Sequence, residues 1–440
     1  MNPPSDHHPR TGPRAWLVLG VYALIAAGAL ALLLVAARSP GIGERLPWPD
    51  VFHTALVVHV DLSVLVWFLA FSALLWSLDR PAPPLPTWIS LGLAWAGTLL
   101  LSISPFVGDG PPLQNNYVPV LLRPLFHAGL GLFALGILMQ ALLGLRRADT
   151  EPFRSLTTRL SALTVLVAAL LFLHAFLVLD DKALPAAARF EYLFWSSGHV
   201  LQFSHGLMLL LCWHLLLGPD SPVPARPALS NRLALLAFIP VLAAPLIEWR
   251  HAIDSAAYRL EYTQLMRFGG LLLAPLGAWL AWRYLARPGR FRDAPHTALG
   301  MSILLFAAGG VLGFLIHGAN VVIPAHYHGS IVGVTLAFMG TAYLLLPTFG
   351  HRIVLTRLTR WQPVVYGGGQ LLHIAGLAWS GGYGVQRKVA GGAQALDTLE
   401  KTIAMGLMGL GGLIAVIGGL LFVVVMAGSL AKDGKLEARS

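Results

Sequence analysis

The stretch IPAHYHGSIVGVTLAFMG, residues 323–340, decides how this chain folds and what it can bind. It opens an apolar run that reaches Leu346, and His326 and His328 stand near its start. Residues two positions apart on an α-helix point about 200° apart. One helix therefore presents a nitrogen ligand on each of two opposite flanks, where two separate metal centres could be held. The alternative is a pair of interfacial histidines, and the positions of the other histidines argue against it.

The composition places this stretch in a membrane protein. Of 440 residues, 56% are hydrophobic and 11% are charged, and the mean hydropathy is +0.69. A soluble protein cannot bury that much apolar surface. We predict an all-α polytopic membrane protein, a twelve-helix bundle that forms one transmembrane domain over residues 1–440. The expected spans are 15–37, 53–78, 88–107, 125–145, 160–179, 192–217, 233–249, 265–284, 298–316, 325–346, 364–378 and 403–430.

The eleventh of these spans is the weakest, because Gly367, Gly368 and Gly369 are expected to interrupt it. A cytoplasmic N-terminus puts most of the 30 Lys and Arg on the inner side, so the positive-inside rule predicts that both termini are cytoplasmic. The inner loops carry two basic groups: Arg146, Arg147, Arg154 and Arg159, and then Arg283, Arg287, Arg290 and Arg292. The net charge of +10 thus favours anionic lipid headgroups, and not nucleic acid, as partners.

Five histidines converge on one depth in this topology. His59, His199, His251, His326 and His328 come from four spans and share the outer third of the membrane. Polar rings in a bilayer are costly and are usually functional. Six others are expected to be hydrogen-bonded core or rim residues: His127, His174, His205, His214, His317 and His373. Four others are expected to be loop residues: His7, His8, His296 and His351.

Imidazole is a usual axial ligand of haem iron, and it also suits copper and non-haem iron. His59 and His328 can hold one haem from both sides, which gives a six-coordinate, low-spin centre. His326 then faces a second haem whose opposite position stays open. His199 and His251 approach that open face and could hold another metal. The only cysteine, Cys212, excludes an internal disulfide framework and an iron–sulfur cluster.

With this arrangement, the chain resembles subunit I of the haem-copper oxidase superfamily, which includes cytochrome c oxidases and nitric oxide reductases. The ligand-bearing spans two, six, seven and ten follow the order found in that family. Four stretches carry the resemblance: VVHVDLSVLVWF at 57–68, FWSSGHVLQF at 194–203, the opening stretch, and GVQRK at 384–388.

The resemblance implies a role for each of these residues. His59 and His328 would be the axial ligands of the low-spin haem, and His326 would be the proximal ligand of the high-spin haem. His199 would be the ligand that span six gives to the second metal. Arg387 and Lys388 fall where the family places two basic residues against haem propionates, which agrees with their position on the outer rim. The alternative for this pair is a solvated loop.

One departure from the family concerns the second metal. Copper-binding members carry adjacent histidines after span seven, whereas this chain reads Glu248-Trp249-Arg250-His251. The spacing of Glu248 and His251 can put both on one helical face. Together with His199 they would form a two-histidine, one-carboxylate set, which suits non-haem iron better than copper. The alternative is that Glu248 pairs with Arg250 or another nearby arginine.

Another departure concerns the redox tyrosine. Many oxidases place a tyrosine four residues after the histidine of span six, where this chain has Phe203, and nitric oxide reductases place a glutamate there. Tyr258 or Tyr262 could substitute, although interfacial anchoring is the ordinary role of such residues. Asp61 lies inside span two and could serve a proton route or a structural hydrogen bond.

The sequence thus predicts the catalytic subunit of a respiratory terminal oxidase in the cell inner membrane, with two haems and a second metal, copper or non-haem iron. It would reduce O2 to water. The alternative is reduction of two NO to N2O, and a minor alternative is a non-catalytic relative in assembly or sensing. The 440 residues contain no cytochrome c or copper-A motif, so we expect a partner subunit, cytochrome c or quinol to donate electrons.

Overall fold

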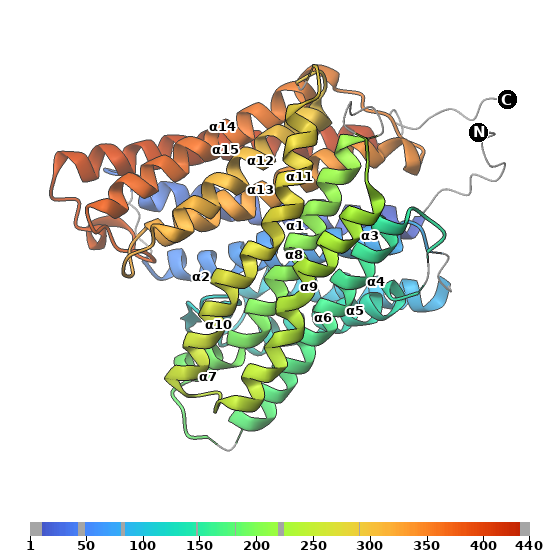
Figure 1. The fold of residues 1–440 in the computed structure, drawn as a ribbon. Coiled ribbons are helices and arrows are strands. Elements are labelled where there is room, and N and C mark those ends of the chain that lie inside the picture. The colour runs from blue at the N-terminus through green and yellow to red at the C-terminus, as the bar shows by residue number, and fades with distance from the viewer. Residues whose placement is uncertain are drawn as a thin grey trace.

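The computed structural model describes residues 11–42, 49–80, 84–146, 148–180, 182–218, 224–289 and 291–431. Over these ranges the chain forms a bundle of long helices (Figure 1). The predicted all-α polytopic fold is confirmed. Four residues named from the sequence, His7, His8, Arg147 and Arg290, lie outside the described ranges.

The long helices are joined by short loops. Their bounds are α1 (Thr11–Arg38), α2 (Pro49–Val60), α3 (Trp67–Ser77), α4 (Pro84–Ile103), α5 (Pro124–Gly144), α6 (Pro152–Leu179), α7 (Ala186–Leu193), α8 (Trp195–Leu217), α9 (Pro227–Arg250), α10 (Ala256–Gly269), α11 (Ala274–Leu285), α12 (Ala294–Phe314), α13 (Val322–Leu345), α14 (Thr356–Gly382) and α15 (Leu399–Leu430). Two short strands, β1 (Pro112–Leu113) and β2 (Val120–Leu121), pair antiparallel as a hairpin between α4 and α5.

Eleven helical segments within the described ranges are long and apolar enough to cross a membrane. Several of them join more than one element: for example, Phe52–Ser77 runs from α2 into α3, and Ala256–Leu285 contains α10 and α11. The remaining predicted span is α14, which is less apolar but is a helix of 27 residues. The expectation that Gly367, Gly368 and Gly369 interrupt this span was wrong, because α14 continues through them.

Gly369 serves helix packing instead. A Cβ atom added at Gly369 would lie 2.4 Å from the backbone nitrogen of Ala415 on α15, and one added at Gly411 would lie 2.3 Å from that of His373 on α14. Small residues let two membrane helices approach closely where no hydrophobic force drives them together. The seam between α14 and α15 is therefore closed by glycines from both helices.

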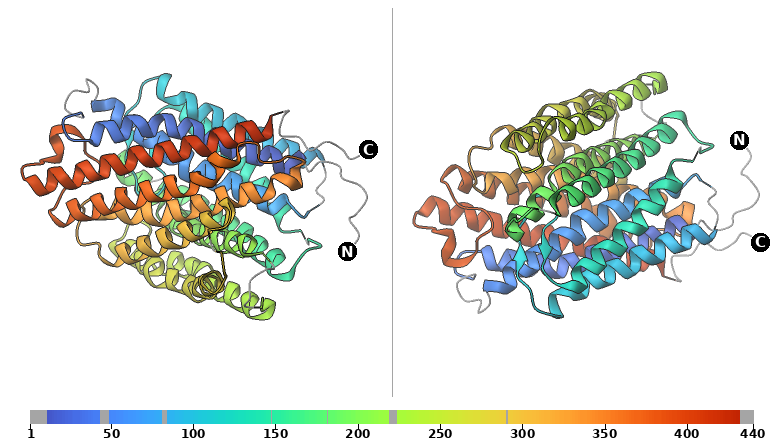
Figure 2. Two further views of the ribbon diagram at one scale, coloured as in Figure 1. Left: turned by 90° about the horizontal axis from the view of Figure 1, so that it is seen from above. Right: turned by 90° about the horizontal axis from the view of Figure 1, so that it is seen from below.

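The helices that carry the opening stretch and His199 lie at the centre of the bundle. α13 and α8 belong to the two most buried candidate spans, in which 83% and 78% of the residues of the apolar stretch are buried. Figure 2 shows the first and last long helices, α1 and α15, side by side on one flank. His199 and His205 on α8 are thereby buried, and His326 and His328 on α13 are half-buried.

The helix that carries His59 changes its winding just after that residue. Asp61–Val66 forms a π-helical segment, η2, between α2 and α3. Such segments occur frequently at functional sites, since they locally alter which side chains face a neighbouring helix. Below η2, Trp67 packs closely on α1, where a Cβ added at Gly20 would lie 2.7 Å from its ring.

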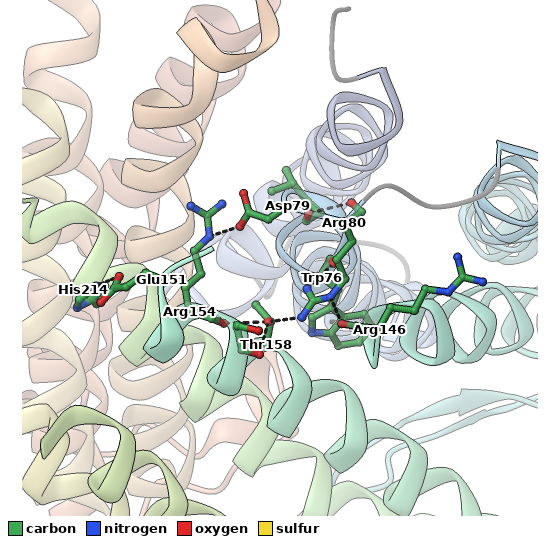
Figure 3. Close-up of polar contacts among 11 residues, drawn as sticks. Trp76, Asp79, Arg80, Arg146, Glu151, Arg154, Thr158 and His214 are labelled. Atoms are coloured by element: carbon green, nitrogen blue, oxygen red, sulfur yellow. Dashed lines mark hydrogen bonds and ion pairs between the residues drawn. The ribbon is translucent and has the colours of Figure 1, made fainter. Parts of the chain in front are cut away.

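At the end of the bundle predicted to be cytoplasmic, a buried arginine ties three helices together (Figure 3). Arg80 donates to the carbonyl oxygens of Trp76 at 2.7 Å and Arg146 at 2.8 Å, and to Thr158 Oγ1 at 2.8 Å. These contacts join the segment after α3 to the ends of α5 and α6. Their three acceptors fill much of the donor capacity of the guanidinium.

Two further pairs extend this cluster, as Figure 3 shows. Arg154 Nε lies 2.5 Å from Asp79 Oδ2, and His214 Nε2 on α8 lies 2.8 Å from Glu151 Oε2. The hydrogen bond with His214 lowers the pKa of Glu151 below its ordinary value, and partial burial opposes that shift. Part of the basic charge of the inner loops is thus used inside the protein, where it fixes helix ends.

Candidate functional site

His59 is held by a main-chain carbonyl of the neighbouring helix. It lies in the last turn of α2, and its Nδ1 atom is 2.9 Å from the carbonyl oxygen of Ala27 on α1. Because a carbonyl oxygen only accepts, the proton must sit on Nδ1. Nε2 then keeps its lone pair, which is the form of histidine that binds a metal.

His328 on α13 lies among other nitrogen-bearing side chains. His373, His59, Arg38 and Gln370 are its polar neighbours. The ring of His373 on α14 is 4.6 Å from that of His328, in an edge-on arrangement. The structure therefore brings the two predicted low-spin ligands, His59 and His328, into one neighbourhood.

His326, two residues earlier, faces a different helix. Its Nδ1 atom lies 2.7 Å from the carbonyl oxygen of Gly309 on α12. A Cβ atom added at Gly313 would lie 2.8 Å from the same ring nitrogen, so α12 approaches the imidazole through glycine. His326 thus contacts α12 while His328 contacts α14. This divergence follows the helical geometry of the opening stretch.

The donor chemistry of these three residues fits haem iron. Three imidazoles on membrane-spanning helices are available, and in His59 and His326 a backbone carbonyl holds the Nδ1 proton and leaves Nε2 for a metal. Their assignment as axial ligands remains a prediction.

His199 on α8 sits in an aromatic cage, which we define as the rings of Tyr117, Trp195 and Tyr262. Their centroids lie 4.5, 4.8 and 5.7 Å from that of the imidazole. Its Nδ1 atom is 2.5 Å from the carbonyl oxygen of Trp195, so Nε2 again keeps the lone pair. The side chain is only 2% exposed. Phe203, one turn further along α8, is fully buried and provides no polar group.

Glu248 uses its carboxylate for hydrogen bonds. Its Oε1 atom accepts from the hydroxyl of Tyr258 at 2.8 Å and from that of Tyr262 at 3.1 Å, while its Oε2 atom lies 2.7 Å from Nδ1 of His174 on α6. The predicted alternative, a pair with Arg250, is not formed, because Arg250 lies 3.5 Å from Glu261 instead.

Glu248 and His251 do not share one helical face. α9 ends at Arg250, and His251 has extended backbone angles of φ −130° and ψ 142°. Its Nε2 atom lies 2.9 Å from Glu261 Oε1 on α10. In the part of the chain that the structure describes, no group of three metal-ligating side chains is placed to hold a metal ion. The residues present thus do not form the expected two-histidine, one-carboxylate set, and we derive no chemical step through a second metal.

The predicted propionate-binding pair belongs to an outer clasp, formed by Gln114, Asn116, Glu191, Arg387 and Lys388. Arg387 donates to Asn116 Oδ1 at 2.8 Å, and Lys388 donates to the carbonyl oxygen of Gln114. Asn116 also donates to both carboxylate oxygens of Glu191 on α7. The pair is therefore not a freely solvated loop.

Both basic residues of the clasp are held in place by their surroundings. The charge of Arg387 also acts on Tyr327, the residue between the two histidines of α13. Lys388 has a positive φ of 62°, which is uncommon for a residue with a side chain. Burial, and then the charge of Arg387, lower the pKa of Lys388 to about 8, while Glu191 opposes the shift. A nearby anion would offset this concentration of positive charge.

Three residues lie near the predicted ligands, and the sequence did not indicate that they do. Tyr117 lies in the hairpin loop, where a local pattern gives no sign of contact with α8. His174 and His373 were expected to be hydrogen-bonded core or rim residues, and His373 does bond to the carbonyl oxygen of Met408 at 2.9 Å. Their positions against Glu248 and His328 depend on contacts between distant segments.

Comparisons with known proteins agree with this geometry. The family model described as cytochrome c and quinol oxidase polypeptide I matches residues 14–421. An uncharacterized protein of Rickettsia prowazekii is 30% identical over 99% of this chain and 100% of its own length. An uncharacterized protein of Aquifex aeolicus is 27% identical over 79% of this chain and 88% of its own length.

A solved structure extends the likeness to the fold. A heme-copper terminal oxidase, determined as a dimer by cryo-electron microscopy, superposes with a TM-score of 0.76 and 18% identity, over 98% of this chain and 85% of that one. At this identity the match shows the fold alone. The family match covers every helix that carries a candidate ligand. The chain therefore belongs to the cytochrome c and quinol oxidase polypeptide I family, a haem-copper oxidase subunit I with multiple membrane spans.

Proposed function

We propose that this chain is the catalytic subunit of a respiratory terminal oxidase that reduces O2 to water in the inner membrane of the cell. The observation that carries the proposal is the divergence of His326 and His328, which face α12 and α14, together with the presence of His59 beside His328. One rigid helix can thus serve two haems at a fixed separation.

The protein's own part in this reaction is to hold and orient. His59 and His328 would hold the low-spin haem and His326 the high-spin haem. When bound, the haems would supply one-electron transfer and an open iron position for a diatomic substrate. Main-chain carbonyls fix the tautomers of His59 and His326. Arg387 and Lys388 would provide positive charge for the carboxylates of the haem propionates. His199 is the residue we expect nearest the open position, with Tyr117, Trp195 and Tyr262 excluding water around it.

Reduction of two NO to N2O is the second candidate. It is favoured by Glu248 in the stretch where copper-binding members carry adjacent histidines, because a carboxylate with two histidines suits non-haem iron. Against it, Glu248 is hydrogen-bonded to two tyrosines and a histidine. Stoichiometric copper with O2 consumption would reject the nitric oxide hypothesis, whereas non-haem iron with NO turnover would reject the oxidase.

A reduced-minus-oxidised haem spectrum of the purified membrane protein tests the haem assignment. We expect bands of one low-spin and one high-spin haem. His328→Ala should abolish the low-spin bands and leave the high-spin haem, while His317→Ala, at an exposed rim histidine, should change neither. Loss of the high-spin haem alone in His328→Ala would show that the two ligands are interchanged. A spectrum without haem would favour a non-catalytic role in assembly or sensing.

The electron donor is expected on another protein. The 440 residues contain a single cysteine, Cys212, which is buried on α8. Covalent haem attachment uses a pair of cysteines followed by a histidine, which this sequence does not contain. We therefore expect electrons to enter at the outer rim. They would come from a partner subunit that carries a cytochrome c or copper centre, or from a quinol.

A further inference from the structure

We propose that Glu248 is a positioning residue. It fixes the phenol of Tyr262 and thereby the imidazole of His199, and it does not act as a ligand of a second metal. The inference rests on the proposed function, because it concerns the pocket that we assign to the diatomic substrate. It follows from the mismatch between the expected metal-binding set and the contacts in the structure.

The carboxylate of Glu248 already has three hydrogen-bond partners, and both positions of its Oε1 atom are in use. A carboxylate offers about four acceptor positions. Two tyrosine hydroxyls use Oε1, and His174 uses Oε2, over distances of 2.7 to 3.1 Å. The side chain of Glu248 is only 7% exposed. A metal ion bound at Oε1 would have to displace one of the two tyrosine hydroxyls, which would leave a buried phenol without its partner.

Tyr262 is the element that Glu248 controls. Its hydroxyl lies 3.1 Å from Glu248 Oε1 and 3.0 Å from the carbonyl oxygen of Ala244, both on α9. Its ring is fully buried and packs edge-on against that of Tyr258, with a centroid distance of 5.0 Å. Two acceptors on α9 share the single hydroxyl proton of Tyr262 and so hold a residue of the next helix in place, which leaves the ring little freedom to rotate.

The pinned ring completes the aromatic cage of His199. Trp195 comes from the same helix as His199, and Tyr117 comes from the hairpin loop. Tyr117 can approach because the residue before His199 is Gly198, where an added Cβ would lie 2.3 Å from the tyrosine ring. Tyr262 is the contribution of α10, and its position depends on α9. Glu248 thus acts on His199 through Tyr262, at the end of the bundle where α9 and α10 meet.

The geometry of His251 supports the same conclusion. A metal-binding role for Glu248 needs a second ligand nearby on α9, but the helix ends before His251 and that imidazole lies against Glu261. The hydrogen-bonding role needs no further ligand. All its partners, Tyr258, Tyr262 and His174, are already in contact.

The test compares Glu248→Gln, Glu248→Ala and Tyr262→Phe in the full-length protein with its haems. A glutamine keeps an oxygen acceptor for both phenols but is a poor metal ligand, so the two roles predict opposite results. Asp254→Asn is the matched control, since Asp254 is a carboxylate on the same rim that pairs with Lys182. The haem content of each variant, from its absorption spectrum, shows whether it is folded.

We expect Glu248→Gln to keep the wild-type ratio of metal to haem, measured by mass spectrometry of the purified protein. It should also keep the ultraviolet resonance Raman bands of hydrogen-bonded tyrosine. Glu248→Ala should shift those bands and also the stretching frequency of carbon monoxide on the reduced high-spin haem, and Tyr262→Phe should shift the carbon monoxide frequency. Reductase activity should fall about tenfold in both, as for other residues that orient a ligand. Asp254→Asn should behave as wild type.

Two results would overturn the inference. Loss from Glu248→Gln of a metal that the wild type retains would make Glu248 a ligand. Unchanged tyrosine and carbon monoxide bands in Glu248→Ala would remove its positioning role. Failure of the proposed function looks different, because the wild type would then lack haem or would not bind carbon monoxide. The tyrosine bands report on Glu248 in that case too.

Discussion

The seam between α14 and α15 gives the sharpest prediction about packing. A Cβ atom at Gly411 would lie 2.3 Å from the backbone nitrogen of His373 and 2.7 Å from the carbonyl oxygen of Gly369. Ordinary contact begins near 3.4 Å, so Gly411→Ala must separate the helices locally by about 1.1 Å, which is 3.4 minus 2.3. Backbone atoms cannot rotate away as a flexible side chain can.

We expect Gly411→Ala to lower the free energy of unfolding by about 1 to 3 kcal/mol, the usual cost of inserting a methyl group into a packed interior. The displaced helix carries His373, whose ring is 4.6 Å from that of His328. The spectrum of the low-spin haem should therefore change together with stability. Thermal unfolding of the detergent-solubilised protein and the reduced haem spectrum measure the two effects.

Gly406→Ala is the matched control, on the same helix but with nothing within 4 Å of the added atom. It should be neutral or slightly stabilising, because alanine favours a helix more than glycine does. If both variants unfold at the same temperature with the same spectrum, the argument that glycine closes this seam is refuted.

Two predictions concern pH. The pKa of Glu151 is lowered by its hydrogen bond with His214. The stability that this pair contributes is therefore present above the pKa of Glu151 in the unfolded chain, and it is lost as the pH falls through the pKa of Glu151 in the folded protein. Glu151→Gln should remove that acid-dependent loss, as measured by unfolding between about pH 6 and pH 3. For Lys388, burial lowers the pKa from 10.5 to about 8, so the unfolded chain binds more protons between those values and stability should rise with pH there. Lys388→Met should remove this rise in stability with pH. If the haem-free variant shows the same slope of stability against pH as the haem-free wild type, the lowered pKa of Lys388 is refuted.

Local periodicity was sufficient for some features of this protein. Hydropathy predicted the helical bundle, and the angle between residues two apart predicted that His326 and His328 face different helices. These inferences depend only on composition and on the geometry of one helix. The same local reasoning was wrong for α14, because glycines in a membrane helix can serve packing as well as interruption.

Features that depend on where a helix ends, or on distant contacts, were beyond such reasoning. The three-residue spacing of Glu248 and His251 suggested one helical face, but α9 ends between them. Tyr117 reaches His199 from a hairpin loop 82 positions earlier in the chain, the difference between 199 and 117. No local pattern contains that information, since loop conformation is set by tertiary contacts.

The π-helical segment η2 fixes the number of residues between two contacts that this helix makes with α1. Above it, His59 is fixed to the carbonyl oxygen of Ala27, and below it, Trp67 is fixed against Gly20. Deleting one residue within 61–66 would restore α-helical winding and turn one half by about 100° against the other. One of the two anchors on α1 would then be lost. A chain that keeps both anchors must keep the extra residue, so insertions and deletions should be excluded from this segment even where substitutions are tolerated.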